Sequence, residues 1–184
     1  QKYEPLLCAQ DKRYTLFPIP ANEMEIFKFY KRHLSTIWTP EELNWANALR
    51  DFEAYPNNVQ HWIKQILSFF ASSDIIIFDN LLTNFIAQIT NTTCQMFYSV
   101  QAMMEAVHTE VYSLLIDKLI SNAAEKARLF NAIEEMPSVK KKAEFCFRRM
   151  DKNRSFAEQL FVFGLFEGVA FASSFAGIYY IKYL

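Results

Sequence analysis

Residues 160–181 form an apolar run that is interrupted by a single charged side chain, that of Glu167. The run is long enough to cross a lipid bilayer as a helix. A membrane helix would place the Glu167 carboxylate in hydrocarbon at a cost of several kcal/mol, whereas a bundle of helices can surround the run with protein. Because we find no second span of comparable character, we expect a helix buried on all sides and no membrane partner.

The composition favours an all-α fold. Only three of the 184 residues are glycine and 52% are hydrophobic, as is typical of helices around a large core. We therefore expect residues 1–184 to form one helical domain, an up-and-down bundle. Pro5, Pro18 and Pro20 disfavour a helix near the start, so residues 1–21 are expected to form an extended arm.

Capping residues divide the rest of the chain into helices. Thr39 and Pro40 followed by two acids predict a helix start, and Asn57 and Asn122 are further candidate caps. We expect helices over residues 22–35, 40–56, 57–89, 94–120, 122–136, 138–151 and 156–184. The helix over 57–89 is expected to bend near residues 72–73, where two serines are adjacent.

Charge and cysteine usage restrict the partners and the compartment. The formal net charge is −1, which gives no indication of a nucleic-acid partner. Cys8, Cys94 and Cys146 are far apart and have no zinc-binding spacing. Reduced thiols in the cytoplasm fit this pattern best.

Glu105, His108 and Tyr112 form the most informative pattern. Glu105 and His108 are three residues apart in a strongly helical segment, and Tyr112 is one turn beyond His108, so all three project from one face. A Glu-x-x-His pair is a recurring way to bind a dinuclear metal centre within a four-helix bundle. The same two residues could equally be a core histidine that is hydrogen-bonded to the glutamate.

Two further acids lie in apolar helical segments. Asp74 is flanked by phenylalanines and isoleucines, and Glu167 is the one acid of the apolar run. Buried carboxylates are costly unless they are paired, and a metal would satisfy all of them together. Carboxylates with few imidazoles suit iron or manganese. Phe171 and Phe175 share the face of Glu167 and are either ordinary core residues or a barrier that keeps water from reactive chemistry.

These residues resemble the small subunit of class I ribonucleotide reductase, most closely of the eukaryotic type. The resemblance covers nearly the whole chain and includes the segments that begin at Phe17, Ile37, Phe69 and Phe130 as well as the acids, the histidine and the tyrosine. It implies a ferritin-like helical bundle and a homodimer. It also implies a large catalytic subunit as partner and reduction of ribonucleotides to deoxyribonucleotides.

The resemblance also implies roles for individual residues. Metal ligands of a centre of two iron ions, with manganese as a possible substitute, would be Asp74, Glu105, His108 and Glu167. The other implied roles are a radical at Tyr112, an electron route through Trp38, and a radical pocket lined by Phe171 and Phe175.

The family's second Glu-x-x-His is missing. The remaining histidines, His33 and His61, have no glutamate three residues before them. We expect that the chain is truncated at its C-terminal end, and that these residues alone would bind metal weakly or not at all and carry no radical. Two alternative hypotheses for the function are a di-iron oxidase without a stored radical and a metal-free helical partner subunit.

Overall fold

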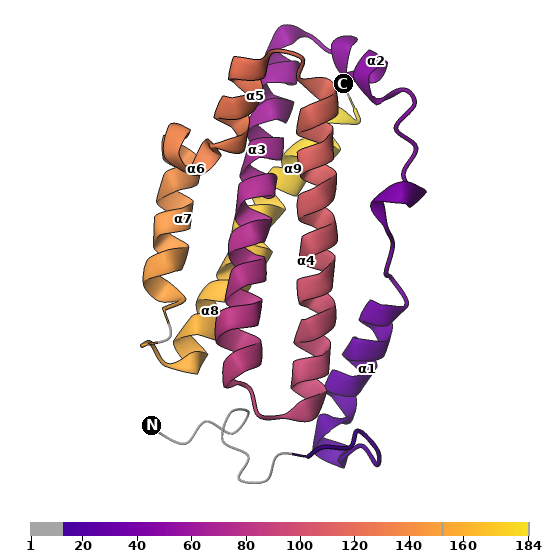
Figure 1. The fold of residues 1–184 in the computed structure, drawn as a ribbon, viewed down its shortest axis with the longest axis vertical. Helices are drawn as coiled ribbons and strands as arrows, with labels where there is room; N and C mark the ends of the chain where they lie inside the picture. The colour runs from indigo at the N-terminus through magenta and orange to yellow at the C-terminus, as the bar shows by residue number, and fades with distance from the viewer. Residues whose placement is uncertain (1–12, 152, 184) are drawn as a thin grey trace.

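The structure, a computed structural model, describes residues 13–151 and 153–183, in which every regular element is a helix (Figure 1). The α-helices are α1 (Met24–Leu34), α2 (Ala48–Glu53), α3 (Asn57–Asn80), α4 (Thr92–Leu119), α5 (Ala123–Phe130), α6 (Ala132–Glu135), α7 (Pro137–Arg149), α8 (Phe156–Leu165) and α9 (Ala172–Ile181). Short 3-10 helices are η1 (Ala21–Glu23) and η2 (Pro40–Glu42), and π-helices are η3 (Leu81–Ile86) and η4 (Phe166–Phe171). The all-α prediction is confirmed.

The helices α3 and α4 form the antiparallel centre of the bundle (Figure 1). Helix α1 packs against α4, helices α5 to α7 lie beside α3, and the α8–η4–α9 rod crosses obliquely behind both central helices. The predicted break between the central helices is present, because the Asn91 side chain caps α4 by accepting a hydrogen bond from the Cys94 N–H. The core lies between these elements and includes Phe70, Ile77, Leu81, Phe85 and Ile116.

The helix predicted over residues 40–56 is wrong in its first half. Thr39 and Glu42 form a capping box, but the turn that follows is the three-residue helix η2. Leu43 is extended, and the Asn44 side chain accepts a hydrogen bond from the Ala46 N–H. This local turn competes with helix formation, so the helix restarts only at α2.

The irregularity in the long helix after Asn57 lies later than predicted. Residues 72–73 are part of regular α3, whereas the π-helix η3 begins at Leu81. The hydroxyl of Thr83 donates to the Asp79 carbonyl within this junction. A π-helix is a common site of local strain or function within an α-helix.

The rod formed by α8, η4 and α9 is not buried on all sides, contrary to the prediction. One face packs on α3 and α7, and Gly177 permits close approach there, since a Cβ at this position would lie 2.5 Å from the Trp62 ring. The other face leaves Phe161, Val169 and Tyr179 exposed by 66, 62 and 69%. Among the described helices nothing covers that face.

Two helices of the described chain are long and apolar enough to cross a membrane: Asn57–Ile86 and Phe156–Ile181. The first of them contradicts the expectation that residues 160–181 have no counterpart. The first is mostly buried as a central core helix. In the second, only 22% of the most apolar stretch is buried. Length and composition alone do not distinguish a membrane span from a core helix.

The described part of the N-terminal arm, residues 13–20, has no helix, as predicted. Its anchor is Arg13, whose guanidinium donates to the Glu23 carboxylate at 2.6 Å and to the Thr93 hydroxyl at 2.9 Å. The arm is thereby tied to the start of α4. The first twelve residues, including Cys8, lie outside the described part.

Candidate metal centre

Asp74, Glu105 and His108 meet in the middle of the bundle. One ligand atom from each of these three residues lies within 4.8 Å of the other two. Helix α4 supplies Glu105 and His108 from adjacent turns of one face, and α3 supplies Asp74 from the facing side of the central pair. The structure thus brings together three of the four side chains that the sequence offers as metal ligands.

Glu167 lies outside this group of three donors. It is part of the π-helix η4 and is partly buried. Its charge is nevertheless close enough to act on Asp74, since it contributes to the pKa of that residue. The structure therefore places the fourth predicted ligand beside the cluster but does not gather it into the same set.

Two carboxylate oxygens at this site lack hydrogen-bond partners among the described residues. Asp74 Oδ2 and Glu167 Oε1 are buried and have no partner among the described residues. His108 Nδ1 lies 3.4 Å from Glu105 Oε2, which is long for a hydrogen bond. A core histidine that simply satisfies a glutamate would leave these other oxygens unexplained.

Burial and mutual repulsion favour the protonated acids. Burial, followed by the charges of Glu105 and Glu167, raises the pKa of Asp74 to about 9. Burial, followed by the charge of Glu105, raises the pKa of Glu167 to about 8. Without a cation these two acids hold protons near neutral pH, because close carboxylates cannot all ionise in a dry site.

Tyr112 packs next to this cluster. Its ring stacks on Phe70 at 4.9 Å between centroids, and the His108 ring lies at 6.4 Å. Burial, then the charges of Asp74 and Glu105, raises the pKa of the Tyr112 phenol. The phenol is therefore neutral, and its ring is in contact with apolar side chains.

Phe70 is the aromatic residue that sequence reasoning missed. It is buried, and besides the Tyr112 ring it contacts Phe171 and Phe175, at 5.7 and 4.9 Å between ring centroids. Its position four residues before Asp74 in α3 could have revealed it, because residues four apart share a helix face. Phe171 is buried as expected, but Phe175 is 42% exposed.

Trp38 lies next to His108. The centroids of the two rings are 5.9 Å apart with an interplanar angle of 35°. Trp38 precedes η2 and is partly buried. The segment that precedes Pro40 thus brings an aromatic side chain to the histidine of the cluster.

The donor set fits a divalent metal. Two carboxylates and one imidazole offer oxygen and nitrogen atoms of the kind that iron and manganese accept. The unpaired buried oxygens of Asp74 and Glu167 are those that a cation would satisfy. Glu167 could join such a site from η4.

The family model of the ribonucleotide reductase small chain matches residues 13–183. The chain belongs to this family. A ribonucleoside-diphosphate reductase small chain from Arabidopsis thaliana is 40% identical over 179 residues, and a small subunit from Plasmodium falciparum is 39% identical over 177 residues. These alignments include 97 and 96% of this chain.

Solved ribonucleotide reductase small subunits share the ferritin-like helical fold of this chain. The Rnr4 homodimer from Saccharomyces cerevisiae aligns with a TM-score of 0.82 and 31% identity, over 96% of this chain and 55% of the Rnr4 chain. The alignments cover 52% of the Arabidopsis protein and 54% of the Plasmodium protein. The chain therefore spans about half the length of the curated relatives it matches.

Proposed function

We propose that this ribonucleotide reductase small chain carries the metal- and radical-generating site of a ribonucleoside-diphosphate reductase. The observation that carries the proposal is the convergence of Asp74, Glu105 and His108 within 4.8 Å, immediately beside a tyrosine packed on a buried phenylalanine. Membership of the family over residues 13–183 supports it.

The proposed metal ligands are Asp74, Glu105, His108 and Glu167. The preferred metal is iron, with two ions per site, and manganese suits the same donors. When bound, reduced iron supplies the one-electron oxidising chemistry that follows its reaction with oxygen. The residues of the chain bind the ions, keep water from the apolar side of the site and accept or hold protons at the carboxylates.

Tyr112 is the proposed radical residue. With the metal bound, the residue would give up one electron to the metal site and its phenolic proton to an ionised carboxylate of that site. The acids whose charges act on the phenol are Asp74 and Glu105. Phe70 and Phe171 shield the ring side of this pocket. Trp38, whose ring centroid lies 5.9 Å from that of His108, is proposed to lie on the electron route towards the metal site.

The proposed partners are a large catalytic subunit, where the radical would start reduction of ribonucleotides, and a second copy of this chain. The similarity to the Rnr4 homodimer supports dimerisation. We also propose a cytoplasmic location, with which the free thiols of Cys94 and Cys146 agree.

Low-temperature EPR on the full polypeptide that contains this chain, after addition of ferrous iron and oxygen, tests the radical. We expect a tyrosyl signal that disappears in Tyr112→Phe while metal content stays unchanged. Tyr98→Phe is the matched control, because Tyr98 is a partly buried tyrosine of the same helix that packs on Phe85 instead. The control should keep the signal.

Two other outcomes of this experiment would each support one of the two alternative functions. A protein that binds iron but forms no radical would be a di-iron oxidase without a stored radical. A protein with neither metal nor radical would be a helical partner subunit. A signal that persists in Tyr112→Phe would remove Tyr112 from its proposed role.

A further inference from the structure

A pocket with two lysines in its wall lies between α7 and the α8–η4–α9 rod. It has a volume of about 500 Å³, and α7 contributes Lys141, Lys142 and Phe145 to it. The rod contributes five lining residues, which are Leu165, Phe166, Val169, Ala170 and Ser173. None of the residues proposed above for the metal centre or the radical pocket lines it.

The rest of the wall is mostly apolar and partly open to solvent. Val169 is exposed by 62%, and Phe145 and Leu165 are also exposed. Apolar surface is stabilised when a ligand removes it from water, and exposed apolar patches with a polar rim often mark binding sites. The wall therefore favours a ligand with an apolar body.

The two lysines of the pocket have no acidic partner. Lys140, which precedes them, forms an ion pair with Glu134 at 3.0 Å. Among the described residues, neither Lys141 nor Lys142 forms an ion pair or a hydrogen bond through its ammonium group. Glu144 of the same helix does not line the pocket. The positive charge at this wall is therefore not neutralised by the residues around it.

The ammonium group of Lys142 lies at the inner part of the pocket. Its Nζ is 3.7 Å from the centre of the Phe69 ring, and Phe69 is 4% exposed and packs against Phe166 at 6.2 Å between ring centroids. Burial lowers the pKa of Lys142, with no carboxylate nearby to raise it. A contact with an aromatic ring offsets only part of the lost hydration of a cation, so this group favours an anion beside it.

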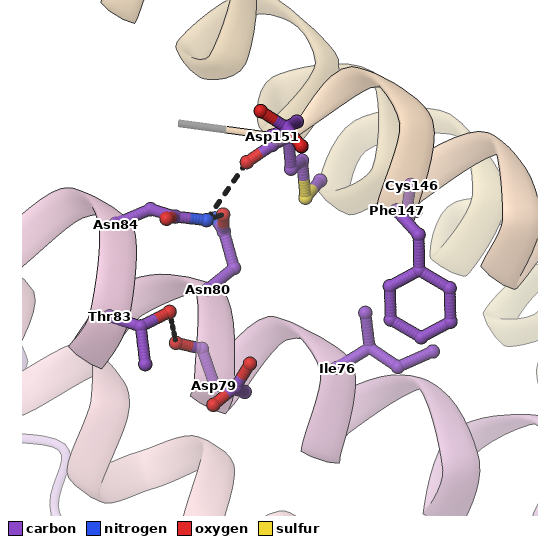
Figure 2. Close-up of a pocket in the computed structure, with 9 residues that line it drawn as sticks. Ile76, Asp79, Asn80, Thr83, Asn84, Cys146, Phe147 and Asp151 are labelled. Atoms are coloured by element: carbon purple, nitrogen blue, oxygen red, sulfur yellow. Dashed lines mark hydrogen bonds between the residues drawn. The ribbon is translucent and has the colours of Figure 1, made fainter. Parts of the chain in front are cut away.

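Another pocket, at the junction of α3 and η3, has the opposite charge (Figure 2). It has a volume of about 300 Å³, and its charged lining residues in the described part of the chain are Asp79 and Asp151. An anion would be repelled by these carboxylates and attracted by the two lysines of the pocket between α7 and the rod. Charge therefore directs an anionic ligand to the lysine pocket.

We propose that the pocket between α7 and the rod binds a small amphipathic anion, a carboxylate with an alkyl chain of medium length. Its carboxylate accepts hydrogen bonds from the ammonium groups of Lys141 and Lys142, which are stronger than those between neutral groups. Its alkyl chain covers Phe145, Phe166 and Val169. An alcohol of the same length lacks the charge that the lysines attract, and an amine of the same length is repelled by them.

NMR titration of octanoate with the full polypeptide that contains this chain, observed on the ligand signals, tests the proposal. We expect saturable line broadening with a dissociation constant on the order of 1 mM, as suits so small a ligand. Two matched probes isolate the contribution of charge, because 1-octanol and octylamine carry the same chain. We expect 1-octanol to bind more weakly than octanoate, and octylamine more weakly still.

Substitution of the two lysines tests which residues recognise the anion. The double variant Lys141→Met, Lys142→Met keeps the apolar stems and removes both charges. It should weaken octanoate binding by about fivefold, since each partly exposed charge contributes modestly. Binding of 1-octanol should stay unchanged, which shows that the variant is folded and its pocket intact. Lys31→Met, at an exposed lysine of α1, is the matched control and should leave both ligands unaffected.

Three results would overturn the proposal. Equal binding of octanoate and 1-octanol by the parent protein would reduce the site to an apolar cleft. An unchanged dissociation constant for octanoate in the double variant would exclude recognition of the carboxylate by Lys141 and Lys142. Absence of saturable octanoate binding would mean that the pocket is closed to this class of ligand in the full polypeptide.

Discussion

Replacing Asp74 by asparagine should change how the stability of the metal-free protein depends on pH. Burial and neighbouring carboxylates raise the pKa of Asp74 from 3.8 to about 9 in the folded protein. Between these values the folded protein keeps a proton that the unfolded chain releases. The free energy of unfolding therefore falls as pH rises, and the stability due to this group is complete only below the unfolded pKa.

The size of the effect follows from the shift. One group in this regime changes the free energy of unfolding by about 1.4 kcal/mol per pH unit. Between about pH 5 and pH 8 the Asp74 carboxyl alone would therefore remove roughly 4 kcal/mol. The pKa of Glu167 is raised to about 8, so this group also lowers the free energy of unfolding as pH rises, over a similar pH range.

Urea unfolding of the chelator-treated protein at several pH values measures this slope. Asp74→Asn, which is neutral at every pH, should lower the slope by about 1.4 kcal/mol per pH unit. Asp79→Asn, the same change at an exposed position of the same helix, should leave the slope of the free energy of unfolding against pH unchanged. The reasoning would be refuted by a pH-independent stability of the parent protein or by an unchanged slope in Asp74→Asn.

Three further substitutions test the site and its packing. His108→Ala should abolish tight metal binding by the full polypeptide, as measured by metal analysis after desalting, while the exposed His61→Ala should not; equal metal content in both would remove His108 from the ligand set. Glu167→Ala should also lower the metal content, and an unchanged stoichiometry would show that Glu167 stays outside the site. Phe70→Ala should destabilise the protein by about 3–5 kcal/mol in urea unfolding, and Phe161→Ala by less than about 1 kcal/mol; similar losses would contradict the burial assigned to Phe70.

The sequence predicted the helical architecture and most helix starts because these depend on local chemistry. Asn91 and Asn122 cap the helices that follow them through their own side chains, and such caps can be read from neighbouring residues. The helix predicted after Pro40 was wrong, also because of local chemistry. The Asn44 side chain forms a local turn that the cap pattern alone does not indicate.

The candidate site was predictable to the extent that it lies on one helix face. Glu105, His108 and Tyr112 project together because of their spacing, and Asp74 was identified by its apolar surroundings. The position of Glu167 relative to the other three residues was not predictable. It depends on the π-helix η4 and on the crossing of the α8–η4–α9 rod with α3. Those features are set by packing between distant segments, as is the exposure of Phe161.

Metal uptake should release protons and should therefore strengthen as pH rises. Near neutral pH the acids Asp74 and Glu167 hold protons in the metal-free protein, and a cation binds their ionised forms. Stability of the metal-free protein and affinity for metal thus change in opposite directions with pH, although the same carboxyls cause both. Calorimetric titration with manganese in two buffers of different ionisation enthalpy measures the released protons. We expect a release that falls in Asp74→Asn, and binding without proton release would contradict the raised pKa of both acids.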